Sequence, residues 1–343
     1  QEYGGIKLSS APSPPDKRDY PYPKVLRLAG AVNLPRPEEL SYRSMLPEEP
    51  FDQGKRGSCV AASSAHVVKR HRETKEGDCP ANGFSAAALY SRCKALDGNP
   101  NEEGTYLRVA LDVLVKEGIP PEDLFPYDKL TSLPEPRVPE VPTEVIAAGE
   151  RYRIRTYAKL CGYDDKTRDK SLVDMVKEAL FRDGALVMAV VVTESFFDLK
   201  KNVIPLPAGR WLGLHAIGGT GYNPVHCELR NTWGKRWGDK GYGYLPWQWF
   251  FHQINVNGYG FIWSVVEAWT VTDIEVPRAA KRIEIAPGRP TMLVDDIEVA
   301  LDQPAMIHPQ TNRMLLPLRA LGNNAGYFVT WDAARRVAIL ERV

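Results

Sequence analysis

Three proline-rich stretches constrain the fold of this chain most, because proline kinks or ends a helix in which it occurs. The first covers residues 1–48, the second runs from Leu130 to Pro142, and the third from Val276 to Pro290. We interpret them as an extended N-terminal arm, a connection within a larger body, and a linker. They predict a body at residues 49–275, a linker at 276–290 and a C-terminal domain at 291–343.

The first half of the body has the periodicity of helices. Apolar residues recur at helical spacing from Ser58 to the basic residues that end at Arg72. A second helix is predicted at Ser85–Leu96 with Ser85 as its N-cap. A third is predicted at Tyr106–Lys116, with Gly118 just beyond its end.

The second half of the body has the alternation typical of strands. After one more helix at Ser171–Phe181, the pattern predicts mainly β-structure. The expected strands are Arg151–Arg155, Ala185–Val192, His215–Tyr222, Val225–Asn231, Gly241–Leu245 and Ser264–Val271. Helices followed by strands indicate an α+β fold with two lobes, and a site between the lobes could draw residues from both.

The charge balance excludes several classes of function. The chain has 44 basic and 43 acidic side chains, a formal net charge of +1, so no domain-wide positive field is available to hold nucleic acid. The longest apolar run, Gly184–Thr193, is far too short to span a membrane. The chain begins with Gln1, and we expect that a signal segment has been removed or that the chain was trimmed.

Five cysteines are too few for a disulfide scaffold in a chain of this length. If one of them is a free nucleophile, Cys79, Cys93, Cys161 and Cys227 remain as an even set. A bridge between Cys79 and Cys93 would close a short loop and contribute about 3 kcal/mol. Buried reduced thiols fit the sequence equally well.

The segment from Gln53 to Cys59 is the most informative in the chain. Cys59 lies in the first turn of a predicted helix, where the helix dipole favours negative charge and lowers a thiol pKa. The alternative is a small buried cysteine that fills a helix end. Gln53, six residues earlier, could donate its amide N–H to an oxyanion together with the backbone N–H of Cys59.

Among the six histidines, His215 is the best candidate for a base. It precedes a run of small apolar residues, and Asn231 follows sixteen residues later with Trp233 close behind. An asparagine side chain can accept from one ring nitrogen and so direct the other at a cysteine. His66 and His71 lie on the predicted helix of Cys59 and are not well placed to reach the thiol. His252 and His308 are expected in surface or packing positions, and His226 could face either way.

Three motifs occur in order, Gln-Gly-x-x-Gly-Ser-Cys from Gln53, His-Ala-Ile from His215, and Asn-Thr-Trp-Gly-x-x-Trp-Gly-x-x-Gly-Tyr from Asn231. Together they resemble the papain-like cysteine peptidases, over roughly residues 45–273. The resemblance implies a helical left lobe and an antiparallel β-barrel-like right lobe. It also implies Gln53 as oxyanion donor, Cys59 as nucleophile, His215 as base and acid, and Asn231 as the residue that orients the histidine.

The same resemblance implies a substrate cleft and marks where this chain departs from the family. The cleft residues are expected to be Gly57, Ser58, Gly104, Thr105, Leu214 and Trp233. Arg56 stands where many members carry a disulfide cysteine, Val60 replaces an aromatic residue, and Gly104-Thr105 replaces a glycine pair. No helical propeptide of the usual type precedes the body. Whether the arm wraps the body or enters the cleft is left open.

Residues 291–343 resemble the N-terminal "stalk" domain of copper amine oxidases, through Val294-Asp295-Asp296, Asn312–Arg319, Thr330-Trp331-Asp332 and Val337-Ala338-Ile339. The resemblance implies a small α+β domain that serves for spacing, attachment or partner contact. It implies no copper, since only His308 could act as a metal ligand there.

These features predict a secreted cysteine endopeptidase that hydrolyses peptide bonds through a Cys59 acyl-enzyme, with no cofactor and no metal. Its expected location is extracellular or at the cell surface. Its expected partners are a peptide or protein substrate and a cell-wall or surface partner for residues 291–343, with no nucleic acid and no membrane span. Two alternatives remain: a surface binding protein with a vestigial papain-like scaffold, and a hydrolase of cell-wall peptides.

Overall fold

The computed structural model describes residues 2–3, 6–16, 19–28, 35–256 and 260–273, together with short segments of the C-terminal region: 283–285, 288–294, 297–301, 304, 306–307, 314–315, 327–332 and 337–342. The chain forms two compact units. The first contains Gln1–Pro23 and Val32–Asp273, and the second contains Lys24–Ala31 and Ile274–Val343. Helix α1, Tyr22–Leu28, contains the junction between them.

The helix that begins at Cys59 is the longest run of helical residues in the described chain. It consists of α2 (Cys59–Ser63), a π-helical stretch (Ser64–Lys69) and α3 (Arg70–Glu76). This confirms the predicted helix and extends it by one turn. It ends at Gly77, whose φ of +77° is a conformation that glycine adopts without strain.

The other predicted helices are also present. Helix α4, Ala86–Leu96, begins where expected, since the Ser85 hydroxyl accepts the Ala88 N–H at 2.9 Å. Helix α5 covers Leu107–Lys116. The remaining helices are α6 (Asp128–Thr131), α7 (Thr143–Gly149), α8 (Ser171–Arg182) and 3₁₀ turns at Arg43–Met45, Glu122–Leu124, Glu150–Tyr152, Glu194–Phe197 and Trp247–Phe251.

The second half of the body forms a seven-stranded antiparallel sheet in the order β10-β9-β8-β7-β13-β6, with β4 also paired to β8. The strands are β4 (Leu40–Ser41), β6 (Thr156–Cys161), β7 (Leu186–Thr193), β8 (Trp211–Tyr222), β9 (His226–Arg230), β10 (Tyr242–Pro246) and β13 (Val265–Thr272). A separate hairpin joins β11 (Gln253–Val256) to β12 (Gly260–Trp263).

One predicted strand is wrong. Residues 151–155 include a 3₁₀ turn, and β6 begins only at Thr156. The alternating arginines there are exposed and form ion pairs, Arg151 with Asp78 and Arg153 with Glu150. Their alternation therefore reflects solvent exposure and not one face of a sheet.

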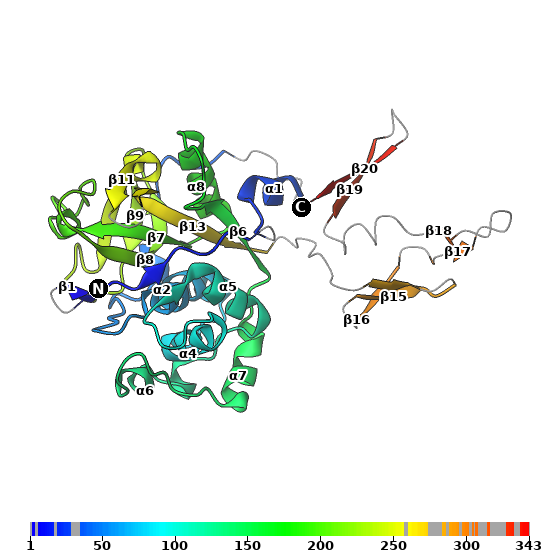
Figure 1. Cartoon of the computed structure of the whole chain (residues 1–343), viewed down its shortest axis with the longest axis horizontal. Helices are drawn as coiled ribbons and strands as arrows, with labels where there is room; N and C mark the ends of the chain where they lie inside the picture. Colours follow the sequence, from blue (N-terminus) through cyan, green and yellow to red (C-terminus); the bar gives the residue numbers. More distant parts are fainter. Residues whose placement is uncertain are drawn as a thin grey trace. The chain divides into compact units, whose positions relative to one another are not determined.

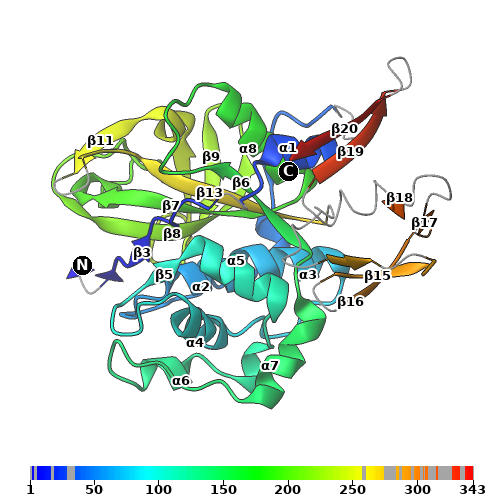
Figure 2. The ribbon, with the colours of Figure 1, turned by 45° about the vertical axis from the view of Figure 1, so that its right-hand side comes forward.

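The main core lies between the helices and the sheet. It joins apolar residues of α2, α4 and α5 to residues of β7, β8 and β13, including Val191, Ala216 and Trp269. Every residue of β7 is buried, which explains why its sequence is apolar up to the final Thr193. Figures 1 and 2 show α2, α4 and α5 together on one side of the body and α8 beside the strands.

The N-terminal arm lies between these two parts of the first unit. It contains the hairpin β1 (Glu2–Tyr3) with β2 (Ile6–Lys7), and then β3 (Ser10–Ala11). Strand β3 pairs in parallel with β5 (Thr105–Tyr106) and also contacts β8, as Figure 2 shows. The arm therefore enters the region where the substrate cleft was predicted.

The described residues of the C-terminal region form short antiparallel pairs. Strands β14 (Ile283–Ile285), β15 (Thr291–Val294) and β16 (Ile297–Ala300) make a three-stranded sheet, and β17 (Met306–Ile307) pairs with β18 (Met314–Leu315). The predicted closing hairpin is confirmed by β19 (Tyr327–Asp332) and β20 (Val337–Arg342). Most of the expected strand-to-helix segment at 315–321, and His308, fall outside the described residues.

Candidate active site

Cys59 is the first residue of α2 and is completely buried. Its Sγ accepts the backbone N–H of Ala216 on β8 at 3.5 Å, so the helix start and the sheet meet at this sulfur. Ser9 of the arm also contacts Cys59, through both its backbone and its side chain. The sulfur is thus enclosed by the helix, the sheet and the arm.

The environment of Cys59 raises its thiol pKa, and burial is the main cause. Contacts with the backbone of Ala216 and with Ser9 act in the opposite direction but do not outweigh burial. The expected lowering of this pKa by the helix N-terminus is therefore wrong for the arm-covered state. The arm removes water from the sulfur, and a thiolate loses more from that than a neutral thiol does.

His215 on β8 is held by Asn231, which directly follows β9. The ring Nε2 lies 2.8 Å from Asn231 Oδ1, as the sequence predicted. The other ring nitrogen, Nδ1, is buried and has no hydrogen-bond partner among the described residues. Burial lowers the pKa of His215 to about 4, although the hydrogen bond to Asn231 favours the protonated ring. The imidazole is therefore neutral near pH 7.

Trp233 covers the His215–Asn231 pair from one side. Its ring centroid lies 4.3 Å from that of His215, and it stacks against Phe197 at 5.7 Å with the planes 7° apart. Only 7% of Trp233 is exposed. The indole thus keeps water away from the hydrogen bond between histidine and asparagine.

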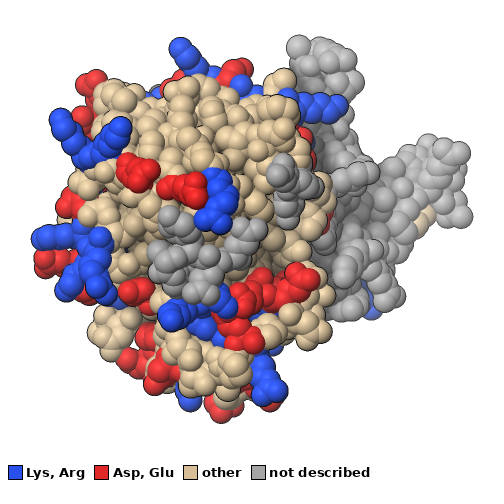
Figure 3. All heavy atoms as spheres, turned by 60° about the vertical axis from the view of Figure 1, so that its left-hand side comes forward, with Lys and Arg blue, Asp and Glu red and all other residues tan. Residues whose placement is uncertain are grey.

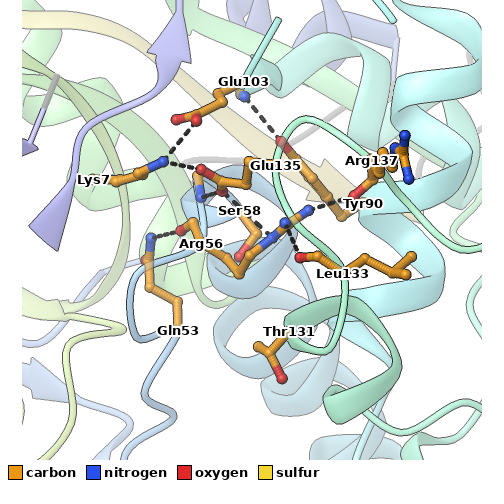
Figure 4. Close-up of polar contacts among 12 residues, drawn as sticks. Lys7, Gln53, Arg56, Ser58, Tyr90, Glu103, Thr131, Leu133, Glu135 and Arg137 are labelled. Atoms are coloured by element: carbon orange, nitrogen blue, oxygen red, sulfur yellow. Dashed lines mark hydrogen bonds and ion pairs between the residues drawn. The ribbon is translucent and has the colours of Figure 1, made fainter. Parts of the chain in front are cut away.

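Gln53 is completely buried beside the loop that leads to Cys59. Its Oε1 accepts the Thr232 hydroxyl at 2.7 Å. Its Nε2 donates to the carbonyl of Arg56 at 2.9 Å (Figure 4). An amide nitrogen carries two hydrogens, so the second remains for another acceptor. Because the Arg56 carbonyl can only accept, the amide end that faces it is the nitrogen.

The predicted cleft residues divide into two groups. Gly57, Gly104 and Thr105 lie against the arm, since a Cβ on Gly57 would meet the Ser9 hydroxyl at 2.7 Å and Thr105 pairs with Ser10. Ser58, Leu214 and Trp233 are buried in the body. The Ser58 hydroxyl contacts the Tyr127 hydroxyl at 2.6 Å, and Leu214 belongs to the main core.

The sequence pattern missed several residues that surround the arm. Gly213 approaches Leu8 so closely that a Cβ on the glycine would lie 2.8 Å from the leucine Cβ. Glu103 and Glu135 both contact Lys7. An acidic residue directly before Gly104 was the one available signal, whereas Glu135 lies in a connection with no pattern of its own.

All five cysteines are free, so the bridge considered between Cys79 and Cys93 is not formed. Cys93 is buried in the main core, where burial raises its pKa. Two of the other histidines have packing roles: His66 stacks on Phe51 with ring centroids 3.8 Å apart, and His71 Nδ1 accepts the Ala185 N–H at 3.3 Å.

The part of the chain that the structure describes contains no group of three or more histidine, cysteine or acidic side chains placed to hold a metal ion. Within the same residues, no helix combines the length and the apolar character needed to cross a bilayer. Basic and acidic groups are interspersed on the face drawn in Figure 3.

In this α+β body the sulfur of Cys59, at a helix start, contacts Ala216, and the neighbouring His215 is bonded to Asn231. Residues 37–249 match the family model of the papain family cysteine proteases, and the chain belongs to this family. Residues 240–340 match the copper amine oxidase N-terminal domain, in agreement with the resemblance seen in the sequence.

Relatives from distant organisms share this region. An uncharacterized peptidase C1-like protein of Acanthamoeba polyphaga mimivirus is 24% identical over 232 residues, which are 63% of this chain and 70% of that protein. Cysteine proteinase 2 of Entamoeba histolytica is 24% identical over 221 residues, 62% of this chain and 64% of that protein.

Solved structures agree on the papain-like fold. Xylellain, a cysteine protease from Xylella fastidiosa, superposes with a TM-score of 0.61 at 21% identity, covering 79% of this chain and 98% of xylellain. Digestive procathepsin L 3 of Tenebrio molitor superposes with a TM-score of 0.51 at 18% identity, covering 70% of this chain and 71% of that one. The predicted α+β fold is confirmed.

Proposed function

We propose that this chain is a cysteine endopeptidase with Cys59 as nucleophile and His215 as its base and acid. One observation carries the proposal: Asn231 holds His215 Nε2 at 2.8 Å, while Nδ1 is left without a partner among the described residues. The next residue, Ala216, contacts the Cys59 sulfur. The free ring nitrogen is therefore available for a proton from the thiol.

The reaction follows from these positions. His215 Nδ1 takes the Cys59 proton, and the thiolate attacks the peptide carbonyl to form a C–S bond. The same nitrogen returns its proton to the leaving amine as the C–N bond breaks. A water molecule then gives one proton to Nδ1 and attacks the thioester, which releases the acid and restores the thiol.

The oxyanion would be held by two donors. The Cys59 N–H belongs to the first turn of the helix, where backbone N–H groups lack helical partners. The second hydrogen of Gln53 Nε2 would be the other donor. Loss of one such donor costs about 3 kcal/mol of transition-state stabilisation.

The course of the arm supports cleavage within a chain. The arm runs from Lys7 past Ser9, which contacts Cys59, and on to Ser13, whose hydroxyl bonds Glu267 at 3.0 Å. The arm thus continues in both directions from the residue at Cys59, which favours cleavage within a chain over cleavage at a chain end.

The experiment that tests the proposal is hydrolysis of an unfolded protein substrate by the full chain and its variants. Cys59→Ala should abolish cleavage. Cys79→Ala, which replaces a half-buried cysteine near α3, should retain it. Cleavage by the Cys59→Ala chain would exclude Cys59 as nucleophile.

A second candidate function is a surface binding protein whose papain-like body is a scaffold. The complete burial of Cys59 and its raised thiol pKa favour it. Iodoacetamide labelling of the Lys7→Ala chain, in which the arm has lost its ion pairs, separates the two functions, because only a reactive site is then modified rapidly and stoichiometrically near neutral pH. Digestion of purified peptidoglycan beside a protein library would separate a cell-wall hydrolase from a general endopeptidase.

We further propose that the protein acts outside the cell and that residues 291–343 contact a cell-wall or surface partner, with 276–290 as the linker. The match to the copper amine oxidase N-terminal domain and the exposure of Met306 (56%) and Ile307 (42%) support this role. Cosedimentation with isolated cell walls should be weaker for a Met306→Asp, Ile307→Asp chain. Equal sedimentation would argue against this partner surface.

A further inference from the structure

The ammonium group of Lys7 lies between two carboxylates. Its Nζ is 2.6 Å from Glu103 Oε1, and it also contacts Glu135 Oε2 (Figure 4). The side chains of Lys7, Glu103 and Glu135 are 23%, 33% and 10% exposed, so the contact is largely shielded from water. The lysine is a bound cationic group and not a solvated surface charge.

This carboxylate pair is adjacent to the candidate nucleophile. Glu135 Oε1 accepts the backbone N–H of Gly57 at 2.7 Å, two residues before Cys59. Glu103 directly precedes Gly104, which touches Ser9, and Ser9 contacts Cys59. Two residues of extended chain span at most about 7 Å, so the cation belongs to a residue very near the one at the sulfur.

The position of Glu135 is set by the body and does not depend on the arm alone. Arg56 lies 3.4 Å from Glu135 Oε1 and is anchored by the carbonyls of Leu133 at 3.0 Å and Arg137 at 2.8 Å (Figure 4). Only 5% of Arg56 is exposed. The acidic group is thus prearranged beside Gly57.

The single positive charge of Arg56 cannot neutralise both Glu103 and Glu135. The pair therefore needs a second cation. The pKa of Glu103 is raised, first by burial and then by its neighbour Glu135. Burial alone would lower the pKa of Lys7, but its hydrogen bonds to Glu103 and Glu135 prevail and raise it. Without Lys7, the pair would favour any basic side chain of similar reach.

We propose that Glu103 and Glu135 form a subsite for a lysine or arginine side chain of the peptide substrate, beside the bond that is cleaved. Lys7 occupies this subsite as an internal ligand. The proposal rests on the endopeptidase function proposed above and specifies its substrate class as peptides with a basic residue near the scissile bond.

The test uses irreversible peptidyl ketone probes that differ only in one residue, two positions before the residue that carries the reactive group: lysine, arginine, norleucine or glutamate. The rate of Cys59 modification is followed by intact mass, both for the natural full chain and for full-length Lys7→Ala, in which the subsite is open. We expect lysine and arginine probes to react at least about tenfold faster than norleucine, as charged hydrogen bonds predict.

The ratio of the lysine rate to the norleucine rate isolates the subsite, because any change in arm release affects both probes equally. Glu103→Gln should lower this ratio several-fold, and Glu135→Gln should do the same while keeping an acceptor for the Gly57 N–H. The matched control is Glu102→Gln, one residue away and exposed, which should leave the ratio unchanged.

Equal rates for lysine and norleucine would overturn the subsite while leaving the nucleophile in place. A ratio that both glutamine variants leave unchanged would also overturn it. No modification of Cys59 by any probe, in either the natural chain or Lys7→Ala, would contradict the proposed endopeptidase and with it this inference. The failures of the two proposals are therefore distinguishable.

Discussion

The carbonyl oxygen of Ser9 lies 1.6 Å from the place that a Cβ on Gly104 would occupy. Gly104 has a φ of +81° and is fixed on both sides, since its N–H donates to the Tyr90 hydroxyl at 2.9 Å and its carbonyl accepts from Lys94 at 3.0 Å. The glycine therefore cannot withdraw from the arm. Only the missing side chain lets the two backbones meet.

Gly104→Ala should displace the arm as well as strain the backbone. The left-handed conformation alone costs roughly 1–2 kcal/mol for an alanine. Hydrogen exchange at residues 8–11 should become faster, and the free energy of unfolding should fall. Gly98→Ala is the control, because Gly98 has a φ of +76° and a Cβ placed there would have nothing within 4 Å. If hydrogen exchange at residues 8–11 is unchanged in both variants, the close contact between Gly104 and Ser9 does not hold the arm in place.

Lys7→Ala should make Cys59 more reactive. Loss of the ion pairs with Glu103 and Glu135 releases the arm, water reaches the sulfur, and the thiol pKa falls from its raised value. We expect alkylation by iodoacetamide at pH 7 to accelerate about tenfold or more, as each pKa unit changes the thiolate fraction tenfold. The exposed Lys166 provides a control, and Lys166→Ala should match the natural chain.

Asn231→Ala should lower turnover by about 100-fold, because His215 would lose the bond that orients its ring. KM should change little. The Asn231 bond also raises the pKa of His215, so the acid limb of the pH–rate profile should move to lower pH in the variant. Asn82→Ala, an exposed asparagine bonded to Asp123, should leave rate and profile intact. An unchanged profile would assign Asn231 a purely structural role.

His215 should make the fold less stable in acid. Its pKa is about 4 in the folded chain and about 6.5 when unfolded, so between these values only the unfolded chain binds the proton. The resulting decrease in the free energy of unfolding is absent above pH 6.5, grows as the pH falls, and reaches about 3 kcal/mol near pH 4. Glu122 (pKa about 7) and Asp183 (pKa about 6) act with the opposite sign.

The His215 contribution is therefore measured as a difference between chains. Urea unfolding at pH 7.5 and pH 5 should show a smaller acid loss for His215→Asn than for the natural chain. His252→Asn, which removes a half-buried ring bonded to Ser264, should behave like the natural chain. If the free energy of unfolding fell equally between pH 7.5 and pH 5 in all three chains, the lowered pKa of His215 would be contradicted.

Arg56→Met should loosen the connection that carries Glu135. Arg56 donates to the carbonyls of Leu133 and Arg137, and charged hydrogen bonds of this kind contribute about 1.5–3 kcal/mol each. We expect the free energy of unfolding to fall by roughly 2 kcal/mol. Arg137→Met removes an exposed side chain whose carbonyl stays in place, and should cost little.

The local parts of this molecule were predictable from sequence. Ser85 caps α4, β7 follows its apolar run, and the bond between His215 and Asn231 joins two motifs that stand sixteen residues apart. In each case the signal is a short pattern with a known geometric consequence. The false strand at Arg151–Arg155 shows the limit, because alternation also arises from exposure.

The contacts around the arm were not predictable. Lys7 meets residues 96 and 128 positions away, and Gly57 meets Glu135 across 78 positions. No periodicity links such residues, since their meeting depends on how the arm crosses the finished body. Burial of Cys59 was missed for the same reason: the helix start is visible in the sequence, whereas the residue that covers it is not.

The parallel pairing of β3 with β5 has a consequence for how the protein responds to its surroundings. The arm is part of the same chain, so its effective concentration at Cys59 is set by the tether, about millimolar for short flexible connections, and does not fall on dilution. A peptide from solution must therefore compete for the site with the arm, which stays attached to the body. Occupancy of the site is thus governed by the strength of the arm's contacts and by the integrity of its covalent connection, and the amount of protein in solution has no influence on it.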